Sequence, residues 1–168
     1  MNNDKKQNGM IVDQIKDGLV IDHMPAGSSL RVLAVLNLTN KEFLQTDKII
    51  AVAMNVRSDK SGRKDVLKIS DHELSETMAD LLGLVIPGAT LNLIRGHTVV
   101  QKKQLAPPAI VSGLVCPAEN CITNFREDIT PQFQVTREES SFRVRCTFCE
   151  QNFIFEDRWR SMLPLQGT

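Results

Sequence analysis

The chain has 168 residues, of which 42% are hydrophobic, so it is long enough for one medium domain or two small ones. Twenty basic residues balance twenty acidic ones, and this zero net charge argues against a strongly basic nucleic-acid-binding protein. The polar start MNNDKKQNG has no apolar core of a signal peptide, and the apolar stretches are too short to cross a bilayer. We therefore expect a cytoplasmic protein without a membrane span.

The first predicted elements are a strand and a helix. Residues 1–9 are predicted to be a disordered tail, and 19–24 a short buried strand. After a Pro-Ala-Gly-Ser-Ser break, Ser28 or Ser29 is predicted to cap a helix through RVLAVLNL. The apolar residues of this helix recur at roughly helical spacing: Leu30, Leu33 and Leu36, with Val32 offset.

A hairpin and a second helix follow. Residues 48–56 are rich in β-branched side chains, SDKSGRK is typical of a turn, and DVLKI indicates the returning strand. Ser75 is a good N-cap for the second helix. The apolar residues of that helix fall on one face, at Met78, Leu81, Leu82 and Val85.

Pro87 and Gly88 end the second helix, and two more strands, ATLNLIR and HTVVQKK, flank a tight turn at Arg95 and Gly96. The order is β-α-β-β-α-β with one extra strand. This order predicts an α+β, ferredoxin-like domain, in which an antiparallel sheet carries both helices on one face.

Pro107 and Pro108 form a semi-stiff spacer, where we place a domain boundary. It separates a first domain at 1–107 from a small all-β domain at 108–168. The second domain contains the short β-like pieces FQVT, SFRVRC and FIFED.

All four cysteines lie in the second domain, as the pairs Cys116-x4-Cys121 and Cys146-x2-Cys149. Each pair can present two sulfur atoms from one turn, and structural Zn²⁺ sites use four thiolate or imidazole ligands in a tetrahedron. Because no histidine follows His97, the four sulfurs are the only complete local ligand set. We predict one structural Zn²⁺ per chain.

Three other uses of the thiols stay open at this stage. Two disulfides would suit a secreted protein, but no export signal is visible. A redox-active CTFC pair would leave the other pair without a purpose. An iron–sulfur cluster would need the same number of ligands.

A metal would also stabilise the second domain, since a segment of about 60 residues has a hydrophobic core that gives only marginal folding stability. Zinc binding supplies on the order of 10–16 kcal/mol of apparent folding free energy in small peptides. A closed four-sulfur shell has no open coordination position, so we expect no catalysis at the metal. Arg143 and Arg145, on the preceding strand, are expected to offset its negative charge.

Four charged or titratable residues stand at strand ends of the first domain: Asp22, His23, Lys68 and Lys102. The first strand of a ferredoxin-like sheet is central, so these residues are expected to lie close together. Two lysines beside a histidine make a phosphate cradle, while backbone groups around Asn92 and Ile94 can read a base. The plainer alternative of a solvated surface stays open, because neither a Walker loop nor a GxGxxG motif is present.

Five sequence motifs are specific enough to compare the chain with a known family. VIDHMPAG, SGRKDVLKI, PGATLNLI, LVCPAENCI and CTFCE occur in this order between about Ile15 and Phe155. In order, spacing and two-domain layout they resemble the regulatory chains of aspartate carbamoyltransferase. The resemblance implies a non-catalytic regulatory subunit in pyrimidine biosynthesis.

The resemblance also implies partners. The first domain would bind a nucleoside triphosphate, with CTP and UTP as inhibitors and ATP as an activator. The zinc domain would dock on the catalytic chain, and regulatory chains would pair as homodimers that join catalytic trimers. No nucleic acid and no membrane is expected as a partner.

The positions of the family's sites carry over to residues of this sequence. The implied zinc ligands are Cys116, Cys121, Cys146 and Cys149. The implied nucleotide-binding residues are Ile15, Asp22, His23, Lys64, Lys68, Thr90, Asn92, Ile94, Val99 and Lys102.

The sequence departs from the family at three positions. His97 stands where tyrosine is usual, Ala118 replaces a polar residue in the first zinc loop, and Gln151 replaces a lysine after the second. Asn120 and Glu150 match interface positions of the family. We expect the packing of the base pocket and the size of the allosteric effect to differ accordingly.

Two other functions compete with this interpretation. The four cysteines would suit a zinc-ribbon adaptor that binds nucleic acid, against which stand the neutral charge and the few aromatic residues. A stand-alone enzyme using Asp22 and His23 lacks a nucleophile and a cofactor motif. The terminal segment DRWRSMLPLQGT, past the usual end of the family, is expected either to be disordered or to pack Trp159 on an apolar patch.

Overall fold

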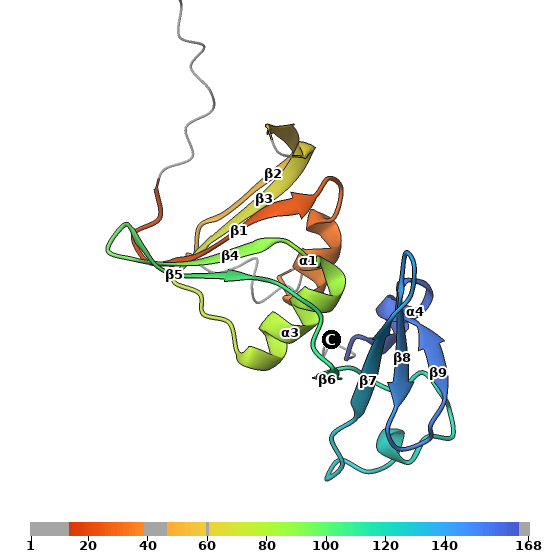
Figure 1. The fold of residues 1–168 in the computed structure, drawn as a ribbon. Helices are drawn as coiled ribbons and strands as arrows, with labels where there is room; N and C mark the ends of the chain where they lie inside the picture. Colours follow the sequence, from red (N-terminus) through yellow and green to blue (C-terminus); the bar gives the residue numbers. More distant parts are fainter. Residues whose placement is uncertain (1–13, 39–46, 60, 165–168) are drawn as a thin grey trace, which may run out of the picture.

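The structure, a computed structural model, describes residues 14–38, 47–59 and 61–164. It contains a sheet with helices, followed by a second, smaller sheet (Figure 1). The tail predicted at residues 1–9 lies outside these ranges. None of the helices described is long and apolar enough to cross a membrane.

The first sheet is antiparallel, with the strand order β2-β3-β1-β4-β5. Strand β1 is central, as expected for a ferredoxin-like sheet, and β5 is the extra strand at one edge. The α+β prediction for this domain is confirmed. The strands are β1 (Gly18–Pro25), β2 (Ile50–Ser58), β3 (Gly62–Ser70), β4 (Thr90–Arg95) and β5 (Thr98–Gln104).

Helices α1 (Ser29–Val35) and α3 (Glu76–Val85) lie on the side of this sheet that faces the second sheet (Figure 1). Helix α3 forms as predicted. The side chain of Ser75 accepts a hydrogen bond from the backbone N–H of Met78 at 3.2 Å, and Leu81 and Leu82 are buried in the core. The other face of the sheet carries no helix in the part of the chain that is described.

Helix α1 is shorter than predicted and presents a different face. It ends at Val35 instead of continuing through Leu38. Leu30, expected in the apolar stripe, is 67% exposed, whereas Val32 and Val35 are buried. The hydroxyl of Ser28 donates to the carbonyl of Pro25 at 2.6 Å and does not cap the helix.

The cap of α1 comes from Asp65 on β3, a carboxylate with 0% exposure. One of its oxygens accepts hydrogen bonds from the backbone N–H groups of Gly27 and Ser29, both at 3.0 Å, and from the hydroxyl of Ser29 at 2.7 Å. The other accepts from the backbone N–H of Asn55 at 2.7 Å, at the bulge of β2, where Asn55 has φ +57°. Asp65 therefore ties the β1–α1 loop and the β2 bulge to the centre of the sheet.

The second sheet has the order β6-β7-β8-β9 and confirms the prediction of a small β domain. The predicted pieces FQVT and SFRVRC lie in its two longest strands. The elements are β6 (Ile110–Ser112), the 3₁₀ turn η1 (Ile122–Asn124), β7 (Gln132–Arg137), β8 (Phe142–Cys146), β9 (Asn152–Ile154) and α4 (Phe155–Met162).

The strand predicted over FIFED is wrong beyond Ile154, because the chain leaves the sheet there and starts α4. Phe155 and Met162 at the two ends of α4 are 1% and 0% exposed, and Glu156 accepts a hydrogen bond from the backbone N–H of Phe142 at 3.2 Å. Trp159 is partly buried against the core. Of the two expectations for the terminal segment, packing of Trp159 is therefore confirmed.

We predict that Asp65→Asn destabilises the chain by about 1–3 kcal/mol at neutral pH, because an amide places N–H donors against N–H donors. Burial alone would raise the pKa of Asp65, but hydrogen bonds from Asn55, Ser29 and Gly27 outweigh it and lower that pKa. The stabilisation is thus present above the unfolded-state pKa of about 3.9 and is lost as pH falls through the lower folded-state pKa. Urea unfolding at pH 7 measures the first effect, and the difference between Asp65→Asn and a control variant between pH 7 and pH 3 measures the second, because acid releases the metal from both variants alike.

The exposed Asp47 provides the matched control, and Asp47→Asn should unfold like the wild type. Equal urea midpoints for Asp65→Asn and Asp47→Asn would contradict the assignment of Asp65 as the cap of α1.

Candidate functional site

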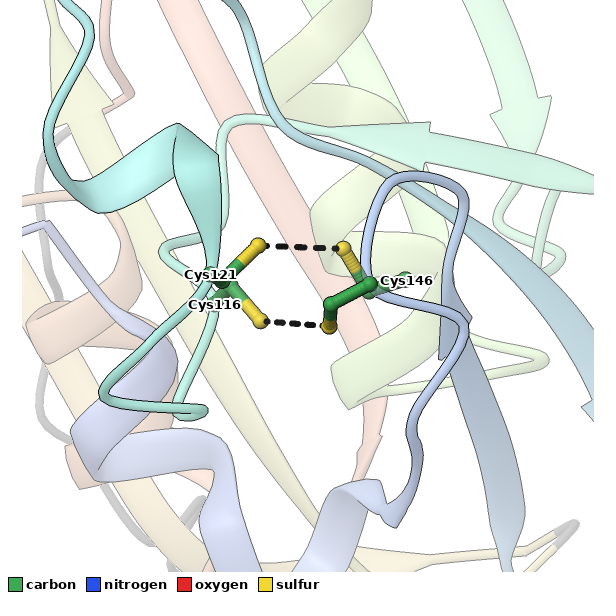
Figure 2. A group of neighbouring side chains, drawn as sticks. Cys116, Cys121 and Cys146 are labelled. Carbon is green, nitrogen blue, oxygen red and sulfur yellow. Dashed lines mark hydrogen bonds between the residues drawn. The ribbon is translucent and has the colours of Figure 1, made fainter.

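The four cysteines converge from two loops. Cys116 and Cys121 lie in the loop between β6 and β7, next to η1, while Cys146 ends β8 and Cys149 follows in the next turn. Figure 2 shows Cys116 and Cys121 on one loop, with their sulfur atoms directed across a small gap toward the loop of Cys146. All four sulfur atoms lie within 4.8 Å of one another.

The sulfur separations fit a single metal ion. The Sγ atoms of Cys116 and Cys149 are 3.6 Å apart and those of Cys121 and Cys146 are 3.8 Å apart. Four sulfurs bound to one ion at about 2.3 Å occupy tetrahedral corners about 3.8 Å from each other. A disulfide would need about 2.05 Å, and all four thiols are free. The thiolates of a four-iron cluster each bind a different iron and are spread farther apart.

Two polar side chains that the sequence analysis missed support the first loop. The hydroxyl of Thr123 lies 3.1 Å from the sulfur of Cys121. The side-chain amide of Asn124 donates to the carbonyls of Cys116 at 3.0 Å and of Ala118 at 2.8 Å. A hydroxyl and an amide directly after a cysteine ligand are the signal that could have indicated this role, since ligand-bearing loops need such outer hydrogen bonds.

The second loop is closed by its own backbone. The N–H of Glu150 donates to the carbonyl of Cys146, and the N–H of Cys146 donates to the carbonyl of Gln151, both at 3.0 Å. The arginines expected to offset the charge of the sulfurs pair with carboxylates instead. Arg143 contacts Glu138 at 2.5 Å and Arg145 contacts Glu150 at 3.0 Å, so carboxylates share the charge of both arginines and the offset stays a prediction.

Without a bound cation, the pKa values of the clustered thiols are shifted in opposite directions. Burial raises the pKa of the Cys116 thiol. Burial also acts to raise the pKa of Cys121, but hydrogen bonds with Thr123 outweigh it and lower that pKa to about 7. A bound divalent cation favours the ionised form of every thiol, because all four then bind it as thiolates. The four cysteines are a metal-binding site.

A second group of predicted residues gathers on the helix-free face of the first sheet. The register pairs Val20 with Lys68 on β3 and with Asn92 on β4, and Asn92 in turn with Lys102 on β5. Directly opposed residues of antiparallel strands point to the same face. The sheet therefore places both lysines in one cross-strand row, separated by Val20 and Asn92. Neither lysine has an ion-pair partner in the described part of the chain.

In the neighbouring row, two residues along β1, Asp22 pairs with Thr90 of β4 in the register. The Asp22 carboxylate forms an ion pair with Lys64 at 2.7 Å and accepts from the backbone N–H of His23 at 2.7 Å. Burial acts to raise the pKa of Asp22, but the hydrogen bonds from Lys64 and His23 outweigh it and lower that pKa. The ring Nδ1 of His23 is buried, lies 3.3 Å from Asp22 and forms no hydrogen bond.

Two depressions flank the row. One, of about 200 Å³, is lined by Gln14, Ile15, Val20, Lys68, Ile94 and His97. The other, of about 300 Å³, is lined by His23, Arg57, Ser58, Asp59 and Lys64. Predicted residues occur in both. Sequence reasoning missed Arg57, which carries no motif of its own and enters only because the β2–β3 hairpin folds back beside His23.

Val99 lies at the edge of this face. It pairs with Ile94 at the irregularity between β4 and β5 and is 52% exposed. The backbone N–H of His97 in the β4–β5 turn donates to the carbonyl of Lys16 at 2.8 Å. The segment that carries Ile15 is therefore fixed to the turn that carries His97.

Comparison with known proteins identifies related chains. The family model described as "Aspartate carbamoyltransferase regulatory chain, allosteric domain" matches residues 10–106, and the one described as its "metal binding domain" matches residues 108–159. An aspartate carbamoyltransferase regulatory chain of Thermofilum pendens is 43% identical over 86% of this chain and 89% of its own length. Those of Haloquadratum walsbyi and Saccharolobus solfataricus are 43% identical over 82% and 74%, and 38% identical over 94% and 97%, respectively.

We predict that Cys146→Ser abolishes stoichiometric metal binding, because a neutral hydroxyl replaces one of four thiolates in a closed shell. Thr147 lies in the same loop, but its hydroxyl donates to the carbonyl of Gln132 at 3.1 Å, so Thr147→Ala should retain the metal. Elemental analysis of both variants after gel filtration tests this. One ion per chain in Cys146→Ser would contradict the four-sulfur site.

Proposed function

Because the chain belongs to the family of aspartate carbamoyltransferase regulatory chains, a non-catalytic subunit of that enzyme, we propose that its first domain binds CTP and UTP as inhibitors and ATP as an activator. The second domain transmits their effect to catalytic chains in pyrimidine biosynthesis. Family membership supports the regulatory role. The observation that carries the effector assignment is the row that places Lys68 and Lys102 on one open face of the sheet.

The lysine row suits a triphosphate. Lys68 and Lys102 hold the phosphates, as compact cations without an internal counter-charge. Lys64 assists from the neighbouring row, where Asp22 fixes its ammonium at 2.7 Å. His23 lines the same 300 Å³ depression as Lys64 and contacts the phosphates or the ribose.

The depression beside Ile15 suits a base. It is lined by Ile15, Val20 and Ile94, with Lys68 at its polar side. Backbone groups near Ile15, Asn92 and Val99 form hydrogen bonds with the base. Thr90 lies directly opposite Asp22 in the neighbouring row. His97, also in this depression, supplies a smaller polar ring where the family usually has tyrosine.

Opposite effects of a purine and a pyrimidine need no second site. A ligand shifts an equilibrium between two global states only by its difference in affinity for them. CTP and ATP that share the face but contact the base depression differently therefore favour different states. Such couplings are typically about 1–3 kcal/mol.

The metal of the second domain is one structural Zn²⁺. Four thiolates in a tetrahedron suit zinc or iron among common metals, and the closed shell leaves no coordination position for chemistry. Free thiols of this kind persist in a reducing compartment, which supports a cytoplasmic location. The spacer at Pro107 and Pro108 is the boundary between the two domains.

The metal loops also offer a docking surface for the catalytic chain. Ile122, Phe125 and Phe148 are 48%, 69% and 43% exposed and lie on the two loops that hold the metal. Exposed apolar side chains held by a rigid centre are typical of a protein interface. Their apolar character favours a protein partner over nucleic acid.

A homodimer of regulatory chains has its own candidate surface. The edge strands of the first sheet expose apolar side chains: Val52 and Met54 on β2, and Val99 and Val100 on β5. Unpaired edges with apolar side chains favour association with a second chain.

We predict that Lys102→Ala weakens CTP binding about tenfold or more, because a charge-assisted contact to phosphate contributes about 1.5–3 kcal/mol. Lys103→Ala is the matched control. Lys103 is the next residue on β5 but pairs with Leu91 on the opposite, helix-bearing face. Calorimetric titration of the reconstituted complex with CTP measures both affinities, and equal affinities would contradict the phosphate assignment.

We further predict that Phe125→Asp prevents co-purification with the catalytic chain, because a carboxylate would be buried in the apolar docking surface. Zinc content and CTP affinity of the isolated variant should match the wild type. Assembly of Phe125→Asp at wild-type yield would rule out this docking surface.

A further inference from the structure

The two domains touch along helix α3. Gly113, after β6, lies against Thr77 and Leu81, where an added Cβ atom would come within 3.0 Å and 3.2 Å of their side chains. Gly83 packs directly on the backbone of Ala106. The Gly113 contact joins the two domains, while the Gly83 contact holds the residue before the spacer against α3.

A separate contact reaches the first domain from the far end of the chain. Helix α4 is anchored in the metal domain by Phe155 and Met162, which are 1% and 0% exposed. The carbonyl of Met162 accepts from the backbone N–H of Val115 at 2.7 Å, one residue before the ligand Cys116. Trp159 lies on α4 between these anchors, on a helix that is hydrogen-bonded to the first metal loop.

The ring of Trp159 stacks with a cation of the other domain. The guanidinium carbon of Arg31, on α1, lies 5.1 Å from the ring centroid. That of Arg160, on α4 itself, lies 5.3 Å from the centroid. Only the first of these cation–π contacts joins two domains, while the second stays within one helix.

Arg31 in turn stands on α1, on the helix-bearing side of the sheet, and Asp65 ties this helix to the strand that carries Lys64. Asp65, whose hydrogen bonds hold the first turn of α1, directly follows Lys64, the partner of Asp22. A change in the position of Lys64 on binding phosphate would act on α1 through the next residue of β3.

We propose that the Arg31–Trp159 contact couples the effector face to the metal domain, being made in one global state and broken in the other. This inference rests on the proposed function, because it assigns a regulatory role to residues outside the effector site. Arg31 and Trp159 are positioning residues, which bind neither nucleotide nor metal. Coupling of this kind requires an element with two discrete arrangements, which a stacked and an unstacked ring provide.

The chain supplies a matched pair of variants. Arg31→Ala removes the contact between domains, whereas Arg160→Ala removes a contact of the same kind and nearly the same length within α4. Each variant is reconstituted with the wild-type catalytic chain, and the fold-change in carbamoyl-aspartate formation is measured with saturating CTP and with ATP. Zinc content and CTP affinity are measured on the same samples.

We expect Arg31→Ala and Trp159→Ala to reduce the CTP-induced fold-change by about two- to fivefold, the factor that corresponds to one exposed cation–π contact. CTP affinity should change by no more than that factor, zinc content should not change, and Arg160→Ala should respond like the wild type. The double variant should be no worse than either single one, and Arg31→Lys, which keeps a cation, should restore part of the response.

A wild-type response in Arg31→Ala, or an equal loss in Arg160→Ala, would overturn the coupling role while leaving the proposed function intact. A wild-type complex that ignores CTP and ATP would overturn the proposed function, and the coupling role with it. Hydrogen exchange gives a second readout. CTP should change amide protection in α4 of the wild type and leave it unchanged in Arg31→Ala.

Discussion

Four buried or half-buried sulfur atoms within 4.8 Å of one another are the constraint on which the second domain depends. As thiols they bury polarisable groups with poor hydrogen bonds, and as thiolates they repel. Only a shared cation makes the cluster favourable. Hydrogen bonds from Thr123 and Asn124 support the first loop around it, the backbone closes the second, and a four-stranded sheet carries both. The metal therefore acts as the missing part of the core, and it holds Ile122, Phe125 and Phe148 at fixed places on the surface.

In the first domain, the placement of the two lysines on one face depends on strand register. Lys68 and Lys102 are separated by more than thirty positions in sequence, yet the pairings through Val20 and Asn92 bring them to one face. A shift of one residue in β3 or β5 would turn its lysine to the helix side. The buried Asp65 and the paired bulges of β1 and β2 fix that register near Asp22 and His23.

Local patterns predicted much of this from the sequence. The N-cap Ser75, the apolar face of α3 and the central place of β1 follow from periodicity and connection order, and the cysteine spacing indicated the metal. The helix cap supplied by Asp65 was not predictable, since it comes from a strand 36 residues away. The start of α4 at Phe155 was missed because a short alternating apolar run is compatible with strand and helix alike. The face of α1 was misjudged since burial of Val32 and Val35 is decided by packing.

The central claim is that one ion bound by sulfur alone organises the second domain. X-ray absorption at the zinc edge of the freshly purified chain measures the ligand shell directly. Four sulfur neighbours at about 2.3 Å, with no nitrogen or oxygen, are the predicted result. A shell with fewer sulfurs, or one completed by nitrogen or oxygen, would contradict it.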